Sequence, residues 1–262
     1  MKRTLSFILL AACSLLPMGA QAPMDGGVWN DNTGKHINAH GGSIFNYKGT
    51  YYWYGESRSA DGKPYSSLGV SCFTSKNLKD WTNHGLVLPV SSEPGCDIEG
   101  GCIIERPKVL YNARTRKFVM WFHLEMKGKG YAAARSGVAV SDTPFGPFRF
   151  VRSGRVNAGR YPIGFALADT TDLRQKLTEP EYKGWWTPQW YTQIERGMFF
   201  MRDFQGGQMA RDMTVFVDDD DKAYHIFSSE DNLTLNIAQL TDDYMEHNGS
   251  FVRVAAGGLN EA

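Results

Sequence analysis

Apolar and polar positions along the chain recur in one long pattern. Each copy has an apolar stretch, a short polar turn and a second stretch rich in aromatic residues, and the copies are 43–54, 108–122 and 214–227. An isolated hairpin cannot bury its apolar face, so a chain that repeats one must stack the copies against each other. The repetition therefore predicts an all-β fold built from similar units.

A second pair of short strands follows each of the first two hairpins, in 69–81 and 137–148. Two hairpins give four antiparallel strands, which is the content of one propeller blade. A β-sandwich lacks recurrence at such a long period. Parallel α/β folds need amphipathic helices between their strands, and no segment here has that pattern at sufficient length. We therefore expect a β-propeller.

One stretch, 161–209, interrupts the interval before the third hairpin and is rich in aromatic residues, with Trp185, Trp186, Trp190 and Tyr191 among them. Charged and amide side chains are mixed with these aromatics. The stretch is typical of an ordered surface insertion that includes a short helix. Two roles stay open for it, walling a binding pocket or covering the edge of a blade.

Composition narrows the classes of molecule that the protein is expected to bind. The chain has 28 basic and 28 acidic residues, so its charge gives no reason to expect a nucleic acid or an anionic membrane surface as partner. It also has 12 Tyr, 7 Trp and 15 Phe, and exposed aromatic faces are surfaces on which sugar rings stack. Most of these rings are expected in the blade cores, so carbohydrate remains a hypothesis at this stage.

The first 22 residues resemble a secretory signal peptide, followed by one domain over 23–262. Two basic residues precede an apolar stretch over 5–16 that is too short to cross a bilayer, and a small residue, Ala22, ends the segment. We expect an exported protein, periplasmic or extracellular. The alternative is a lipoprotein anchored at Cys13, which ends a Leu-Ala-Ala-Cys sequence.

Three cysteines remain beyond this segment, an odd number for an oxidising compartment. Cys96 and Cys102 flank a short loop and are placed to form a disulfide, which would leave Cys72 as a buried thiol. The alternative is that all three are reduced packing residues. No cysteine or histidine spacing matches a zinc site, so neither a metal nor a cofactor is expected.

Carboxylates stand where the repeated units begin. Glu105 precedes the second hairpin, Asp212 precedes the third, and Glu261 lies at the opening of what reads as a fourth unit. The innermost strands of propeller blades line a central channel, so residues that open the units converge at one end of it. Carboxylates from different blades in one pocket are what glycoside hydrolysis requires.

Two other acidic runs have a structural explanation. Asp218 to Asp221 fall in a hairpin turn, where aspartates are solvated and bond locally. The run from Glu230 to Asn232 ends a strand and is typical of a loop cap. Neither run is included in the expected site.

Several short segments occur in the order typical of one known family. They are 39–44 (AHGGSI), 51–56 (YYWYGE), 69–72 (GVSC), 105–109 (ERPKV), 141–144 (SDTP), 146–148 (GPF), 211–216 (RDMTVF) and 228–232 (SSEDN). With these segments the chain resembles glycoside hydrolase family 43, and within it the exo-β-1,3-galactanases (galactan 1,3-β-galactosidases). The resemblance implies a five-bladed propeller, of which this chain contains about three to four blades.

The resemblance also implies roles for residues, since the family inverts the anomeric configuration. Glu261 matches the general acid, and Asp212 matches the carboxylate whose charge raises the pKa of that acid. Glu105 matches a carboxylate that contacts the terminal galactose, the alternative being a structural salt bridge to Arg106 or Lys108. From the matched segments His40, Arg211 and Trp53 are also expected to bind the substrate.

Two departures from the family pattern bear on catalysis. Where most members carry the aspartate that acts as base, this chain has Gly41 after His40. The galactanases share that absence and use a glutamine further along, and the present sequence ends at Ala262, before such a residue. We therefore expect the catalytic domain to be incomplete.

The expected function is release of terminal β-1,3-linked galactose from plant-type galactan or arabinogalactan side chains, by inversion. Two alternatives stay open. One is an α-L-arabinofuranosidase or β-xylosidase of the same family, because specificity depends on pocket shape, which spacing does not reveal. The other is a non-catalytic glycan-binding fragment.

Overall fold

Three four-stranded antiparallel sheets follow one another along the chain, and strands adjacent in sequence are adjacent in space. The computed structural model describes residues 27–61, 63, 66–166, 172–183 and 187–260. The first sheet contains β1 (His40–Tyr47), β2 (Thr50–Arg58), β3 (Ser67–Ser75) and β4 (Thr82–Pro89). The second contains β5 (Ile103–Asn112), β6 (Lys117–Glu125), β7 (Arg135–Ser141) and β8 (Arg149–Gly154). The third contains β9 (Met213–Val217), β10 (Ala223–Ser229), β11 (Thr234–Leu240) and β12 (His247–Val254).

The three hairpins expected from the sequence are the first two strands of each sheet, which confirms the all-β prediction. The β1–β2 turn shows how the sequence specifies one of them. Lys48 and Gly49 both adopt left-handed φ values, 50° and 73°, between the paired residues Tyr47 and Thr50. A two-residue turn of this kind matches the twist of the strands it joins.

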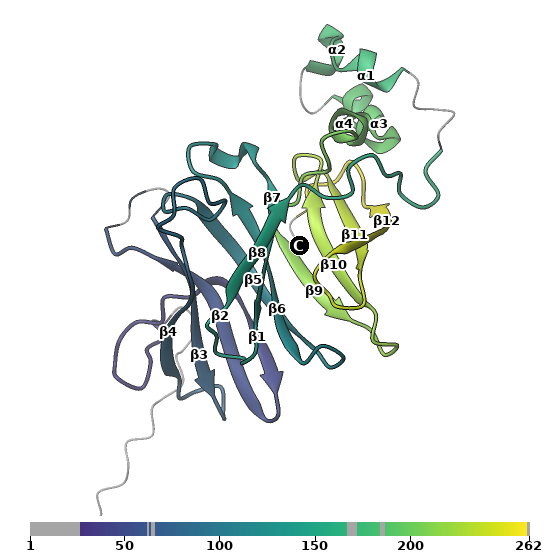
Figure 1. The fold of residues 1–262 in the computed structure, drawn as a ribbon. Helices are drawn as coiled ribbons and strands as arrows, with labels where there is room; N and C mark the ends of the chain where they lie inside the picture. Colours follow the sequence, from purple (N-terminus) through teal and green to yellow (C-terminus); the bar gives the residue numbers. More distant parts are fainter. Residues whose placement is uncertain (1–26, 62, 64–65, 167–171, 184–186, 261–262) are drawn as a thin grey trace, which may run out of the picture.

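The second sheet lies between the other two, and the first strands of the three sheets are neighbours: β5 packs against β1 on one side and β9 on the other (Figure 1). One apolar layer, with Tyr54 and Phe122, joins the first sheet to the second. Another layer, with Trp121 and Phe227, joins the second to the third. Each sheet therefore buries a face that it could not bury alone.

The expected insertion is helical. It contains the helices α1 (Leu173–Lys176), α2 (Pro180–Lys183), α3 (Pro188–Arg196) and α4 (Met198–Asp203). Outside the insertion, a 3₁₀ turn, η1 (Gly130–Ala132), lies in the connection between β6 and β7. Figure 1 shows the four helices gathered over one end of the third sheet. Trp190 is buried against Phe199, and Phe200 packs on Phe251 of β12. Trp190 thus covers the third sheet, while Trp185 and Trp186 lie outside the described residues.

Cys72, Cys96 and Cys102 are free, so the expected disulfide between Cys96 and Cys102 is wrong and the alternative of reduced packing residues holds. Burial raises the pKa of the Cys72 and Cys102 thiols to about 12. The proposed signal segment, with Cys13, lies outside the described residues. Among those described, no helix has the length and apolar character to cross a membrane.

The described parts of the three sheets form no closed ring. Ring closure and a total of five blades therefore stay predictions.

Candidate active site

Three titratable side chains from the second and third sheets converge at one end of the inner strands. Glu105 is at the start of β5, His123 is near the end of β6, and Asp212 immediately precedes β9. One ligand atom from each lies within 4.8 Å of those of the other two. We call these three residues the carboxylate cluster.

An irregularity in β5 brings Arg106 to this cluster. The β5–β6 register shifts between Glu105 and Lys108, and Arg106 has a left-handed φ of 53°. The Nη2 atom of Arg106 donates to Oδ2 of Asp212 at 2.8 Å. Bulges of this type redirect a side chain, and here the bulge makes an ion pair between two sheets.

Gly41 leaves room for Arg106. Gly41 has a left-handed φ of 56°, and a Cβ atom built there would lie 3.3 Å from Cδ of Arg106. A larger residue with the same backbone would therefore be strained and would crowd the guanidinium. The Lys108 ammonium donates to the Gly41 and Arg106 carbonyls at 3.4 and 3.3 Å. Burial and the charge of Arg106 together lower the pKa of Lys108 to about 8.

Glu105 has polar partners from three directions. Its carboxylate accepts from the Tyr131 hydroxyl at 3.1 Å and from Nη2 of Arg58 at 3.3 Å, and Nδ1 of His123 lies 3.2 Å away. Burial raises the pKa of Glu105, but the interactions with His123, Tyr131 and Arg58 together outweigh burial, so the net pKa is lowered. The expected alternative partner was wrong: Arg106 bonds Asp212 instead.

His123 lies between two carboxylates in a buried position. Its Nε2 is 2.9 Å from Oε1 of Glu125, opposite the contact to Glu105. The other oxygen of Glu125 accepts from the backbone N–H of Ala134 at 2.9 Å. Burial lowers the pKa of His123, but the two carboxylates more than compensate and the net pKa is raised. When His123 is protonated, its two nitrogens form ion pairs with Glu105 and Glu125.

An arginine already contacts each carboxylate of the cluster. Although two carboxylates and an imidazole are the ligand types of a divalent cation, the guanidinium of Arg106 neutralises Asp212, and Arg58 contacts Glu105. A metal ion would be repelled by both arginines. The donor set therefore fits a site for an uncharged polar ligand better than a metal site.

Of the other residues expected to bind substrate, His40 and Arg211 lie near the carboxylate cluster. His40 lies 3.5 Å from Glu56, which contacts Arg58 and so connects to Glu105. Arg211 donates to the backbone carbonyl of Tyr131 at 2.9 Å. Its buried Nε atom has no hydrogen-bond partner within the described residues. Both His40 and Arg211 therefore border the carboxylate cluster.

Trp53 does not belong to this group. Side chains alternate along a strand, so Trp53 lies on the face of β2 opposite Tyr54 and Glu56. Its ring packs against Trp29 and Trp81, with centroids 5.4 and 5.3 Å apart. Trp53 therefore stabilises the outer part of the first sheet, and we do not retain it in the site.

Glu261 lies outside the described residues, but the residue before it is anchored next to Asp212. The Ser228 hydroxyl donates to the Asn260 carbonyl at 2.7 Å. The Ser228 backbone N–H donates to the Asp212 carbonyl at 2.9 Å. One residue of β10 thus bonds both the strand that carries Asp212 and the segment that leads to Glu261.

The sequence reasoning missed a feature that occurs in all three sheets. A buried glutamate lies within two residues of the end of the second strand in each sheet, namely Glu56, Glu125 and Glu230. Each is paired: Glu56 with Arg58, Glu125 with His123 and Glu230 with Arg253. A signal was present, because each glutamate is a charged residue at the end of an apolar strand.

Glu230 is held by several contacts at the end of the third sheet that carries Asp212. It is fully buried, and its two oxygens accept from Nε and Nη2 of Arg253 at 2.6 and 2.9 Å. Glu230, Asp231 and Asn232 have left-handed φ values of 52°, 56° and 67°. The Asn232 carbonyl accepts from the Asn260 backbone N–H at 2.8 Å. The run is thus a cap, as expected, and it also anchors the segment before Glu261.

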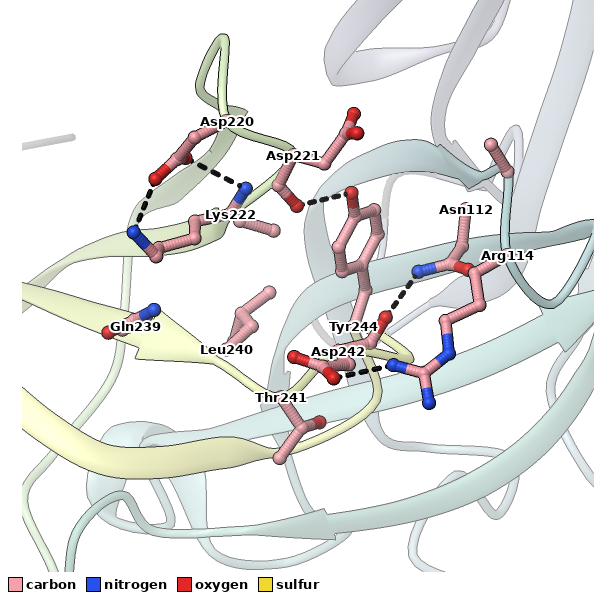
Figure 2. A pocket seen from close by; sticks show the side chains of 12 residues that line it. Asn112, Arg114, Asp220, Asp221, Lys222, Gln239, Leu240, Thr241, Asp242 and Tyr244 are labelled. Carbon is pink, nitrogen blue, oxygen red and sulfur yellow. Dashed lines mark hydrogen bonds and ion pairs between the residues drawn. The ribbon is translucent and has the colours of Figure 1, made fainter.

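A second polar region lies at the opposite ends of the same inner strands (Figure 2). It is a pocket of about 330 Å³ between the turns after β5, β9 and β11. Asn112 donates to the Asp242 carbonyl and the Tyr244 hydroxyl to the Asp221 carbonyl, both at 2.8 Å. Arg114 pairs with the Asp242 side chain, which is 85% exposed. We call this region the turn pocket, and its aspartates are solvated, as the sequence predicts.

Comparison with known proteins identifies the family. No family profile and no curated protein matches the chain. Among solved structures, a family 43 β-1,3-galactosidase in complex with galactodeoxynojirimycin is 56% identical with a TM-score of 0.82, and the match covers 90% of this chain and 68% of that one. The chain belongs to glycoside hydrolase family 43.

Two further members of family 43 support the assignment. Another β-1,3-galactosidase is 36% identical with a TM-score of 0.68, covering 92% of this chain and 40% of that one. An exo-β-1,3-galactanase from Clostridium thermocellum is 34% identical with a TM-score of 0.67, covering 90% of this chain and 41% of that one. The chain thus spans about two thirds of the first relative and about two fifths of these two.

Proposed function

We propose that this family 43 protein is a glycoside hydrolase that releases terminal galactose from β-1,3-linked galactan. The convergence of Glu105 and Asp212 within the carboxylate cluster, beside the anchored residue Asn260, is the observation that carries the proposal. The three similar proteins named above are β-1,3-galactosidases or an exo-β-1,3-galactanase, which supports the same linkage.

The proposed mechanism is inverting. Glu261 donates a proton to the oxygen of the departing sugar, and the negative charge of Asp212 favours the protonated form of this acid. Arg106 holds the Asp212 carboxylate in place through the 2.8 Å bond. Glu105, oriented by His123 and Tyr131, accepts hydrogen bonds from galactose hydroxyls. We propose that a glutamine activates the water, as in the galactanases that the chain resembles.

The proposal extends to architecture and location. The three sheets correspond to three blades of a five-bladed propeller, and the carboxylate cluster lies at one end of its central channel. The chain is exported, with residues 1–22 as signal peptide or, alternatively, a lipid anchor at Cys13. Its polymer substrate is a plant-type galactan or arabinogalactan.

Proton NMR of the reaction with β-1,3-galactotriose tests the proposal. We expect galactose to be released from the non-reducing end and to appear first as the α anomer, because inversion changes the β configuration. Parallel reactions with arabinan and xylan separate this activity from the two alternatives of the same family. Absence of galactose, combined with binding of galactotriose, would instead support a glycan-binding role.

A further inference from the structure

A hollow lined by arginines lies between the outer strands of the second and third sheets. Its volume is about 250 Å³, and its lining includes Arg152 at the end of β8, Arg155 and Arg160 in the following loop, and His247 and Gly249 of β12. The volume equals that of about eight water molecules at roughly 30 Å³ each. The hollow therefore has room for a small polar ligand.

The charge of the hollow is positive. Its lining contains three guanidinium groups and one carboxylate, that of Glu246. Arg155 donates to the Ala133 and Ala132 carbonyls at 3.1 and 2.9 Å and lies 3.5 Å from Asp203. These contacts hold Arg155 in place and offset part of its charge. Glu246 lies 3.5 Å from Nε of Arg152 and offsets part of that charge, so the remaining excess comes mainly from Arg160.

One donor in the lining is buried without an acceptor. Arg152 is already engaged, because its Nη2 donates to the Met245 carbonyl at 2.7 Å and its Nε lies 3.5 Å from Oε1 of Glu246. Nδ2 of Asn157, in contrast, has no hydrogen-bond partner in the described part of the chain. A buried donor without an acceptor costs roughly 1–3 kcal/mol, so an anionic acceptor in the hollow would be favoured.

The loop that carries Arg160 has a defined position. The Arg160 N–H donates to the Asn157 carbonyl at 3.1 Å, and the Gly159 N–H donates to the Phe204 carbonyl at 2.7 Å. Gly249 faces this loop with a left-handed φ of 95°, and a Cβ atom built on it would lie 3.9 Å from Nε of Arg160. The exposed guanidinium of Arg160 thus lies beside a residue that has no side chain.

The charge of Arg152 also acts on His247. Burial, and after it the positive charge of Arg152, lowers the pKa of His247 to about 3. Burial disfavours a charge of either sign, but the contribution of Arg152 indicates a positive potential that favours a negative charge on a ligand.

We propose that this hollow binds an oxyanion, either a free inorganic anion or the carboxylate or sulfate group of an acidic sugar. Arg160 donates charge-assisted hydrogen bonds to it, and Nδ2 of Asn157 donates a neutral one. The proposal does not depend on the hydrolase activity, because none of these residues belongs to the carboxylate cluster.

Isothermal titration calorimetry with the full chain tests this site. Sodium sulfate represents the inorganic source, glucuronate the sugar-borne source, and neutral glucose the control. We expect an anion to bind and glucose not to bind, with affinity falling as salt screens the charges. Tighter binding of glucuronate than of sulfate would identify an acidic sugar as the ligand, and the reverse order an inorganic anion. No heat from either anion would overturn the proposal.

Two matched variants locate the binding. Arg160→Gln removes an exposed charge of the hollow and should weaken binding by about tenfold or more, since it deletes a charge-assisted bond. Arg116→Gln makes the same change at the exposed turn between β5 and β6 and should leave affinity unchanged. The ring NMR signals of His247 should shift on anion addition in both the wild type and Arg116→Gln. Equal affinities for the two variants would contradict the assignment.

Discussion

The two ends of the inner strands contain the same residue types but different chemistry. At the start of β5, the side chains of Glu105 and Asp212 are each 13% exposed and are held by Arg58, Arg106 and a buried histidine. At the turn pocket, Asp242 and Arg114 are 85% and 73% exposed. Composition alone does not distinguish these ends. They differ in the burial of the charged side chains and in whether those side chains converge on one point.

The difference has a physical cause. Water and salt screen exposed ion pairs, which contribute little to stability, whereas partly buried charges interact through a lower effective dielectric. A hydroxyl group brought to the carboxylate cluster would therefore meet oriented charges. The same group at the turn pocket would meet mobile, hydrated ones. Substitutions at the carboxylate cluster and at the turn pocket should therefore differ in their effects.

Asp212→Asn should have the largest effect. Without the negative charge, the proposed acid loses its proton more readily, and galactose release should fall about a thousandfold, or roughly 4 kcal/mol. Initial rates on β-1,3-galactotriose measure it. Asp242→Asn makes the same change at the turn pocket and should keep the wild-type rate. Equal losses in the two variants would mean that the ends are not functionally distinct.

Glu230→Ala tests stability at the end that carries the cluster. It leaves the buried guanidinium of Arg253 unpaired, so the free energy of unfolding should fall by roughly 3–5 kcal/mol. Arg114→Ala breaks an exposed pair and should change it by roughly 0–1 kcal/mol. Urea denaturation followed by tryptophan fluorescence gives both values. A loss below about 1 kcal/mol for Glu230→Ala would remove the proposed distinction.

Glu105→Gln should reduce kcat/KM by about a hundredfold, since a charged acceptor of substrate hydroxyl groups becomes a neutral amide. The measurement is the full dependence of rate on galactotriose concentration. Asp220→Asn, in the turn pocket, is the matched control and should have no effect. If Glu105 only supported the fold, the variant would lose thermal stability without losing kcat/KM per folded molecule.

The pH dependence of stability should report on His123. Its pKa is raised in the folded state, so its contribution is fully present below its unfolded pKa of about 6.5 and is lost as pH rises through the higher folded value. His123→Gln should flatten this loss. Unfolding midpoints measured from pH 5 to 9 check it. Replacement of the exposed His36 by Gln should retain the wild-type curve.

The sequence predicted the local part of this architecture well. The hairpins depend on alternation and turn residues such as Lys48 and Gly49, which act over a few positions. Glu105 and Asp212 could be placed at one end because each stands where a hairpin begins in the sequence. The four helices of the insertion were expected only as one short helix, since their apolar faces are stabilised by packing on the third sheet.

The side-chain contacts of the site residues could not be predicted in the same way. A salt bridge from Glu105 to Arg106 or Lys108 was the alternative to a role in substrate binding, but adjacent residues of a strand point to opposite faces, and the bulge turns Arg106 toward Asp212. His123 and Glu125 come from β6, and only the packed sheet brings them to Glu105. Trp53 could have been excluded, because alternation from Glu56 places it on the other face of β2.

A crystal structure of the chain soaked with galactodeoxynojirimycin tests the central claim, that the carboxylate cluster is the sugar site, most directly. The account predicts the ligand at the start of β5 and β9, with its hydroxyl groups bonded to Glu105 and its ring beside Asp212. Galactodeoxynojirimycin bound in the turn pocket between Asn112 and Tyr244, with the carboxylate cluster empty, would contradict it.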